Sequence, residues 1–128
     1  MRDRRLQAIR LSPENSSHFS NRGFAYTQQN QVERALEDFA QALRLDPKRA
    51  LALYGRAITY SNSAQYELAI ADYDAVLRLE PGWAEALYGR GIAKTKKGDA
   101  AGGQADIAKA TQMDADAAKD FTQRGGRP

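Results

Sequence analysis

The sequence contains no cysteine, which excludes disulfide bonds and thiolate metal sites and leaves the redox compartment open. Its one histidine, His18, has neither a cysteine nor a matched carboxylate spacing beside it, so it makes neither a metal site nor a catalytic triad. A phosphate-binding loop is also missing, because Gly102-Gly103 lacks the flanking Lys-Ser/Thr and a preceding strand. We therefore predict no catalytic residue, no metal and no cofactor, and we expect that the chain is not an enzyme.

Long apolar runs are absent as well. No stretch approaches the roughly 18 residues needed to cross a membrane, and the first residues lack the apolar core of a signal peptide. If Met1 is the natural start, we expect a cytoplasmic protein; the compartment is otherwise unknown. The net charge of +3 lies entirely within residues 1–12. Nucleic-acid binding requires a basic face along the folded domain, so we expect no nucleic-acid partner and no membrane partner.

A repeated phrase is the main feature that the sequence does have. Three segments of the same kind end in Pro13, Pro47 and Pro81, each 34 residues after the last. Further series keep this interval, among them Leu11, Leu45, Leu79 and Met113. A fixed period of this size predicts an array of structural repeats. The alanine content and the scarcity of β-branched runs favour helices over strands.

Within each period the apolar residues predict two helices. The first helices are expected at about 16–29, 50–63 and 84–97, and the second at about 31–45, 65–79 and 99–113. Ser12-Pro13 is read as an N-cap followed by proline at the first helical position, and Asp46-Pro47 and Glu80-Pro81 are read in the same way. Asn30 and Gly98 suit the left-handed turn between paired helices, whereas Ala64 suits it poorly and predicts a different middle turn.

The two ends of the chain are expected to cover the array. Residues 1–12 align with the end of a second helix, so they are either the end of a preceding helix or an N-terminal cap. Residues 115–124 predict a short C-terminal capping helix whose Ala117, Ala118 and Phe121 face the last repeat. Residues 124–128 are expected to be frayed.

The helix pairs resemble tetratricopeptide repeats (TPR), whose 34-residue pattern is Trp-x2-Leu-Gly-x2-Tyr, Ala-x3-Phe and Pro. The corresponding positions hold Phe19, Arg22, Gly23, Tyr26, Ala35, Phe39 and Pro47 in the first repeat, and Leu53, Arg56, Ala57, Tyr60, Ala69, Tyr73 and Pro81 in the second. The third repeat matches less closely. The resemblance implies an all-α, right-handed superhelical solenoid of antiparallel helix pairs. It would consist of three TPR repeats at 16–47, 50–81 and 84–115, plus terminal capping helices at 1–12 and 115–124.

One departure from the family pattern is regular. Where the family has leucine, this chain has arginine, and an aspartate follows sixteen residues later; the pairs are Arg22 with Asp38, Arg56 with Asp72, and Arg90 with Asp106. We predict structural ion pairs between the two helices of each repeat, since charges near packed helices are ordinarily paired. The alternative is that the arginines face a carboxylate of a ligand.

The resemblance also implies a binding site, because the first helices of such repeats line a concave groove. By repeat position the peptide-binding groove would be lined by Ser20, Phe24, Gln28, Tyr54, Ile58, Asn62, Tyr88, Ile92 and Lys96. Tyr54 and Tyr88 are the strongest candidates for contact residues, although they could instead pack against neighbouring helices. The Lys and Asn positions with which some family members hold a C-terminal carboxylate are not matched. This favours an apolar peptide or helix as the ligand.

We therefore predict a non-catalytic protein–protein interaction module that binds a peptide or partner helix of unknown identity. Two alternatives stay open. The chain could be a scaffold fragment of a larger protein whose activity lies outside these residues, or a segment that associates with itself. We expect a monomer or a weak homodimer.

Overall fold

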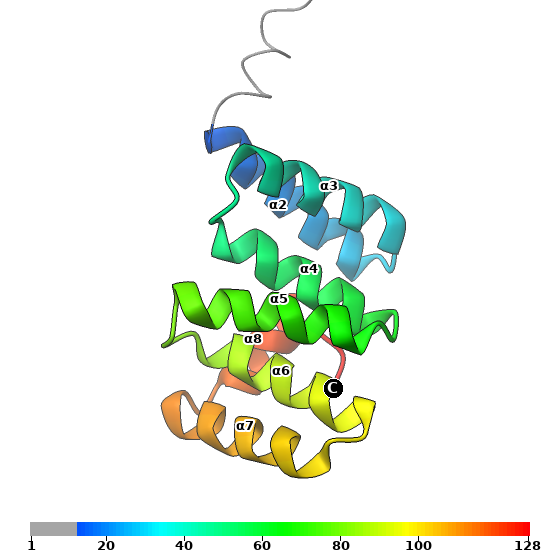
Figure 1. Cartoon of the computed structure of the whole chain (residues 1–128). Helices are drawn as coiled ribbons and strands as arrows, with labels where there is room; N and C mark the ends of the chain where they lie inside the picture. The colour runs from blue at the N-terminus through cyan, green and yellow to red at the C-terminus, as the bar shows by residue number, and fades with distance from the viewer. Residues whose placement is uncertain (1–12) are drawn as a thin grey trace, which may run out of the picture.

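The computed structural model describes residues 13–128, and this part of the chain consists of helices and their connections (Figure 1). The segment expected to precede the first repeat, residues 1–12, lies outside the described residues. The described helices are α2 (Pro13–Gln28), α3 (Val32–Leu45), α4 (Ala50–Asn62), α5 (Tyr66–Leu79), α6 (Ala84–Lys97), α7 (Ala100–Met113) and α8 (Ala117–Gln123). The prediction of an all-α repeat solenoid is thus confirmed, although α2 begins at Pro13 rather than at Ser16.

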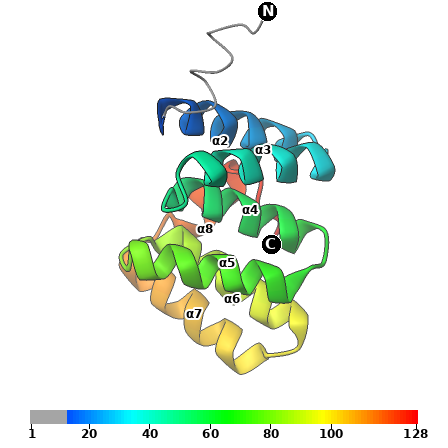
Figure 2. The same ribbon diagram turned by 45° about the horizontal axis from the view of Figure 1, so that its top comes forward.

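The helices form three antiparallel pairs, α2–α3, α4–α5 and α6–α7, stacked one after another (Figures 1 and 2). Helix α3 is amphipathic, and its apolar face buries Ala35, Phe39 and Ala42. Helix α4 is buried on two faces because it contacts α2, α3, α5 and α6. One pair cannot bury its own apolar surface, so stacking of the pairs supplies the core.

Glycine allows the helices to approach each other closely around one aromatic ring. The Phe39 side chain is fully buried, and a Cβ built on Gly23 of α2 would lie 2.8 Å from its Cε1 atom. Gly55 of α4 faces the same ring, and Phe24 meets it edge-on at 5.3 Å between centroids. The ring therefore fills the space between the first and second repeats.

The three turns inside the helix pairs share one conformation, which corrects the expectation for the middle turn. Asn30, Ala64 and Gly98 all have positive φ angles, of 61°, 63° and 113°. In each turn the following N–H donates back to a carbonyl of the first helix, as Gln65 does to Tyr60 at 2.8 Å. Ala64 adopts this left-handed conformation despite its Cβ, because the packing of α4 on α5 determines the path of the chain.

The turns between pairs also differ from the sequence-based interpretation. Pro47 and Pro81 are not the first residues of the next helices, which begin at Ala50 and Ala84. Each proline instead occupies the second position of a turn, closed in the first case by the Arg49 N–H donating to the Asp46 carbonyl at 3.1 Å. Proline suits that position because its fixed φ matches the turn.

The C-terminal segment takes a different course from the one expected. Helix α8 packs mainly against α6 and only slightly against α7, and in Figure 1 it is seen behind α5 and α6. Ala117 and Phe121 are buried, but Ala118 is exposed. The residues after Arg124 are not frayed, since they are hydrogen-bonded to α4 and to the α2–α3 turn. Among the described helices, none combines the length and hydropathy that crossing a membrane requires.

Candidate functional site

The candidate site is the face formed by α2, α4 and α6, which we call the A-helix face. Residues 117–128, consisting of α8 and the chain that follows it, lie across this face, and we call them the strap. The structure places the strap where the sequence analysis expected an open groove.

The central residues of the expected groove are buried. Tyr54 and Ile58 are 0% exposed and Phe24 is 4% exposed. The Tyr54 ring packs near Trp83 and Tyr73, with centroids 5.0 Å and 6.3 Å away. The expectation that Tyr54 is open to solvent is therefore wrong, because α4 has neighbours on two sides and the aromatic rings fill the space between them.

The hydroxyl of Tyr54 is buried without a hydrogen-bond partner among the described residues, as is that of Tyr73. Burial raises the pKa of Tyr54 above its ordinary value, and the negative charges of Glu85 and Asp120 act in the same direction. The charge of Arg124 in the strap acts in the opposite direction. Burial likewise raises the pKa of Tyr73.

The other expected groove residues are not all brought together. Ser20 is buried and donates to the carbonyl of Ser16 in its own helix at 2.9 Å. Tyr88 and Ile92 are half-buried, while Gln28 is exposed and Asn62 half-buried at the end of α4. Lys96 lies apart from the strap contacts, in an open pocket that it lines with residues 64–68 and Lys97.

Side-chain amides of the A-helix face bind the backbone of the strap. Asn62 does so with both ends of its carboxamide: Nδ2 donates to the Gly125 carbonyl at 2.9 Å, and Oδ1 accepts from the Arg127 N–H at 3.2 Å. Gln28 Nε2 donates to the Gln123 carbonyl at 2.8 Å. These contacts engage atoms that every peptide has, so they recognise the backbone rather than a particular side chain.

Three side chains of the strap make specific contacts. Phe121 is fully buried and meets the Tyr88 ring edge-on at 5.4 Å. The guanidinium of Arg124 lies 5.0 Å from the centroid of Phe24, a cation–π distance. The guanidinium of Arg127 donates to Asn30 Oδ1 at 2.9 Å.

Two glycines let the strap turn onto the face. Gly125 has a φ of 101°, which L-residues with a side chain rarely adopt, and its N–H donates to the Thr122 carbonyl at 3.0 Å. The Gly126 N–H donates to the Phe121 carbonyl at 3.0 Å, and a Cβ on Gly126 would overlap the Phe121 ring. This is the left-handed ending common in helices, and it directs the chain from α8 across α4 and α2.

In each repeat, one arginine and one aspartate form a bidentate ion pair that joins the two helices of that repeat. Arg22 Nε lies 2.7 Å from Asp38, Arg56 Nε 2.8 Å from Asp72, and Arg90 Nε 2.8 Å from Asp106. None of these contacts involves the strap. Each guanidinium is held by a carboxylate of its own repeat, which favours a structural interpretation of these arginines over contact with a ligand.

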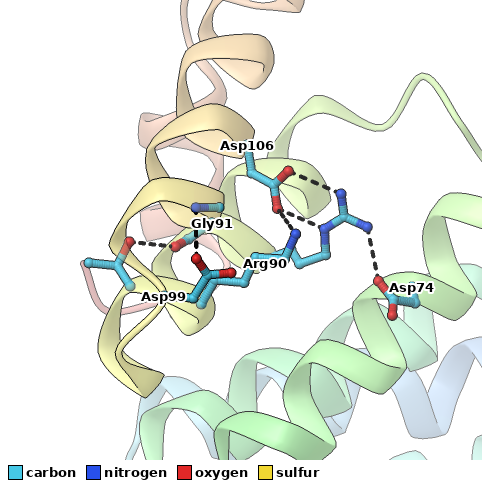
Figure 3. A network of polar contacts seen from close by, with 8 residues as sticks. Asp74, Arg90, Gly91, Asp99 and Asp106 are labelled. Atoms are coloured by element: carbon cyan, nitrogen blue, oxygen red, sulfur yellow. Dashed lines mark hydrogen bonds and ion pairs between the residues drawn. The ribbon is translucent and has the colours of Figure 1, made fainter.

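The third pair belongs to a larger network (Figure 3). Arg90 also bonds Asp74 of α5 at 2.9 Å, and Lys94 lies 3.0 Å from Asp106. Burial alone would raise the pKa of Asp106, but the hydrogen bonds from Arg90 and Lys94 outweigh it, so the pKa lies below its ordinary value. Arg90 thereby joins the second repeat to the third.

Comparison with known proteins agrees with this architecture. A family model for the TPR repeat matches residues 23–63, and a second tetratricopeptide repeat model matches residues 50–82. Together with the stacked antiparallel pairs, these matches decide the family. The chain is a tetratricopeptide repeat protein. No curated protein sequence matches this TPR chain.

Several solved TPR domains share the fold. The first TPR of Spaghetti (RPAP3) bound to the HSP90 peptide SRMEEVD has a TM-score of 0.78 at 16% identity, covering 91% of this chain and 94% of its own. The second TPR domain of human RPAP3 in complex with the HSP70 peptide SGPTIEEVD has a TM-score of 0.75 at 22% identity, covering 91% and 100%. The Sgt2 TPR domain from Aspergillus fumigatus has a TM-score of 0.76 at 25% identity, covering 92% and 78%.

Sequence reasoning found only part of the contact between the A-helix face and the strap. It placed Gln28 and Asn62 in the groove by repeat position, but it did not identify Asn30, Arg124 or Arg127 as contact residues. The pair Gly125-Gly126 next to a helical Phe121 is a signal for a sharp turn back onto the protein. It does not specify the surface on which the turned segment lies.

Proposed function

We propose that this TPR protein is a non-catalytic protein–protein interaction module whose A-helix face binds a peptide segment of a partner. The observation that carries the proposal is the carboxamide of Asn62, which donates to the Gly125 carbonyl and accepts from the Arg127 N–H. These two bonds engage a carbonyl and an N–H of the backbone, which every peptide offers. The peptide complexes of two structural neighbours support the same use of the fold.

The proposal can be tested with a peptide probe once the strap is weakened. Phe121→Ala removes the buried ring that anchors the strap, while leaving the A-helix residues unchanged. We would titrate this variant into a fluorescein-labelled synthetic peptide of residues 114–128 and measure anisotropy. Saturable binding is expected. Adding Asn62→Ala should weaken it at least tenfold, because two hydrogen bonds to the peptide backbone are lost.

Asn21→Ala is the matched control, since Asn21 is an exposed asparagine of α2 outside the strap contacts given above. It should leave the affinity of the Phe121→Ala chain for the probe unchanged. Circular dichroism of each variant checks that helicity is retained. Absence of binding to a folded Phe121→Ala chain, or equal loss with Asn62→Ala and Asn21→Ala, would refute peptide binding at this face.

A further inference from the structure

We propose that the strap is a built-in competitor for the A-helix face, and that the partner segment it excludes is cationic, glycine-containing and anchored by one aromatic residue. This inference rests on the proposed function, since it names the ligand class and the regulation of the same site. The partner's chemistry follows from the chemistry of the strap, because both must satisfy the same side chains.

The strap can dissociate from the A-helix face without separating the three helix pairs. It is joined to α7 by the short connection Asp114-Ala115-Asp116, in which Ala115 and Asp116 are exposed. Helix α8 has only 7 residues, and a helix of that length is not stable by itself in water. Its one large buried side chain is Phe121, beside the small buried Ala117, and its other contacts are the cation–π contact of Arg124 and hydrogen bonds that are exposed or partly buried. Release of the strap therefore leaves the three helix pairs in contact with one another.

Tethering makes the strap an effective competitor. A segment held by a short linker experiences an effective concentration in the millimolar range. A free peptide of the same affinity therefore has to approach that concentration before it displaces the strap. The affinity measured for an added peptide is reduced by the fraction of molecules whose face is open. Any change that weakens the strap alone must then tighten binding of the added peptide.

The contacts of the strap define what an external segment must offer. An aromatic residue is needed at the place of Phe121, against Tyr88. A cation is favoured three residues later, where Arg124 lies over Phe24 and lines a pocket with Glu85. A glycine is needed at the place of Gly125, where φ is 101°.

Charge separates this ligand class from acidic tails. The A-helix face contacts the strap through amides, aromatic rings and the aliphatic side chains around Ala117, and Glu85 is the charged side chain of that face in the pocket around Arg124. Asp120 of the strap already lies in this pocket, so a carboxylate in place of Arg124 would add to those of Glu85 and Asp120 and would lose the cation–π contact with Phe24. The face therefore favours a cationic segment over peptides such as SRMEEVD.

The test compares chains that differ only in the strap. The labelled peptide of residues 114–128 is titrated with the wild-type chain, Phe121→Ala and Gly126→Ala. A methyl group on Gly126 would overlap the Phe121 ring, which is its nearest neighbour. This second variant therefore disturbs the strap without removing a buried ring. Gly82→Ala is the matched control, because nothing lies within 4 Å of a Cβ at that position.

We expect Phe121→Ala and Gly126→Ala to bind the probe at least tenfold more tightly than the wild-type chain, and Gly82→Ala to bind like the wild type. Against Phe121→Ala, the peptide with both arginines changed to glutamate and the peptide SRMEEVD should bind at least tenfold more weakly than the probe. Hydrogen exchange of the wild-type strap should speed up when excess probe is added, because the displaced strap loses its hydrogen bonds.

Each failure has a separate meaning. If the wild-type chain and both strap variants bind the probe with equal affinity, and binding still depends on Asn62, the strap is not a competitor. The proposal of peptide binding at this face would then still stand. Binding of SRMEEVD as tight as that of the probe would overturn the ligand class. A wild-type mass of twice 14.1 kDa that Phe121→Ala returns to 14.1 kDa would show that the strap is exchanged between two copies, which overturns competition within one chain. No binding to any variant would overturn the proposed function itself.

Discussion

Replacement of Phe39 by alanine is the sharpest test of how the repeats are held together. The ring is fully buried between α2 and α4, with Gly23 and Gly55 facing it and Phe24 meeting it edge-on. Loss of a buried phenylalanine costs about 3–5 kcal/mol when the cavity cannot collapse. We expect a loss in this range, because the helices on both sides are held by their own partners.

A second substitution tests the geometry rather than the hydrophobicity. In the wild-type chain, Gly23→Ala would place a methyl group 2.8 Å from Cε1 of Phe39. Overpacking costs about 1–3 kcal/mol, and the better helix propensity of alanine returns about 1 kcal/mol. The net effect should be a loss of about 1 kcal/mol. Without the Phe39 ring the methyl group has room, so the same substitution should gain about 1 kcal/mol.

The assay is equilibrium denaturation followed by circular dichroism on the wild type, the two single variants and the double variant. The expected coupling between positions 23 and 39 is about 2 kcal/mol. Leu68→Ala is the control, since Leu68 is 49% exposed and its loss should change the free energy of unfolding by less than about 0.5 kcal/mol. If Gly23→Ala had the same effect in both backgrounds, the ring would not fill this space and the account of repeat stacking would fail.

Three further predictions concern stability. Ala64→Gly should raise the free energy of unfolding by about 0.5–1 kcal/mol, because it relieves left-handed strain that exceeds the entropy glycine adds to the unfolded chain; a lower melting temperature would contradict this. Gly103→Ala should lower the free energy of unfolding by about 1–3 kcal/mol in denaturant titrations, since the methyl group would overlap the Thr95 hydroxyl. The lowered pKa of Asp106 predicts stability that is present above pH of about 4 and is lost as the pH falls further, because the unfolded chain takes up the proton first. Asp106→Asn weakens the pair with Arg90. In melting curves recorded at several pH values, this variant should lose less stability at acidic pH than the wild-type chain.

Much of the fold follows from residues that recur at one interval. Ala35 and Ala69, like Phe39 and Tyr73, occupy equivalent buried positions of α3 and α5, and the local periodicity that predicts those helices also predicts their buried faces. The middle turn was predicted less well. Local propensity disfavours Ala64 in a left-handed turn, but the packing of two long helices outweighs a strain of about 1–2 kcal/mol.

The candidate site was only partly predictable. Repeat position assigned Gln28 and Asn62 to the A-helix face, and both contact the strap there. It also assigned Tyr54, whose ring is in the core. A helix wheel shows that Tyr54 lies on a second apolar face, but not whether a ligand or a neighbouring ring covers that face.

The helix pairs can be predicted from the residues alone, because backbone hydrogen bonding and the burial of one apolar stripe are local and repeat with the period of 34 residues. The position of the C-terminal segment depends instead on tertiary contacts. Ala117 and Phe121 had to be buried in either case, yet covering the end of α7 and crossing the A-helix face expose the same polar side of α8. The choice depends on the direction in which the chain leaves α7 and on contacts with residues up to 97 positions away, such as Asn30 with Arg127. Contacts of that range have no periodic signature in the sequence.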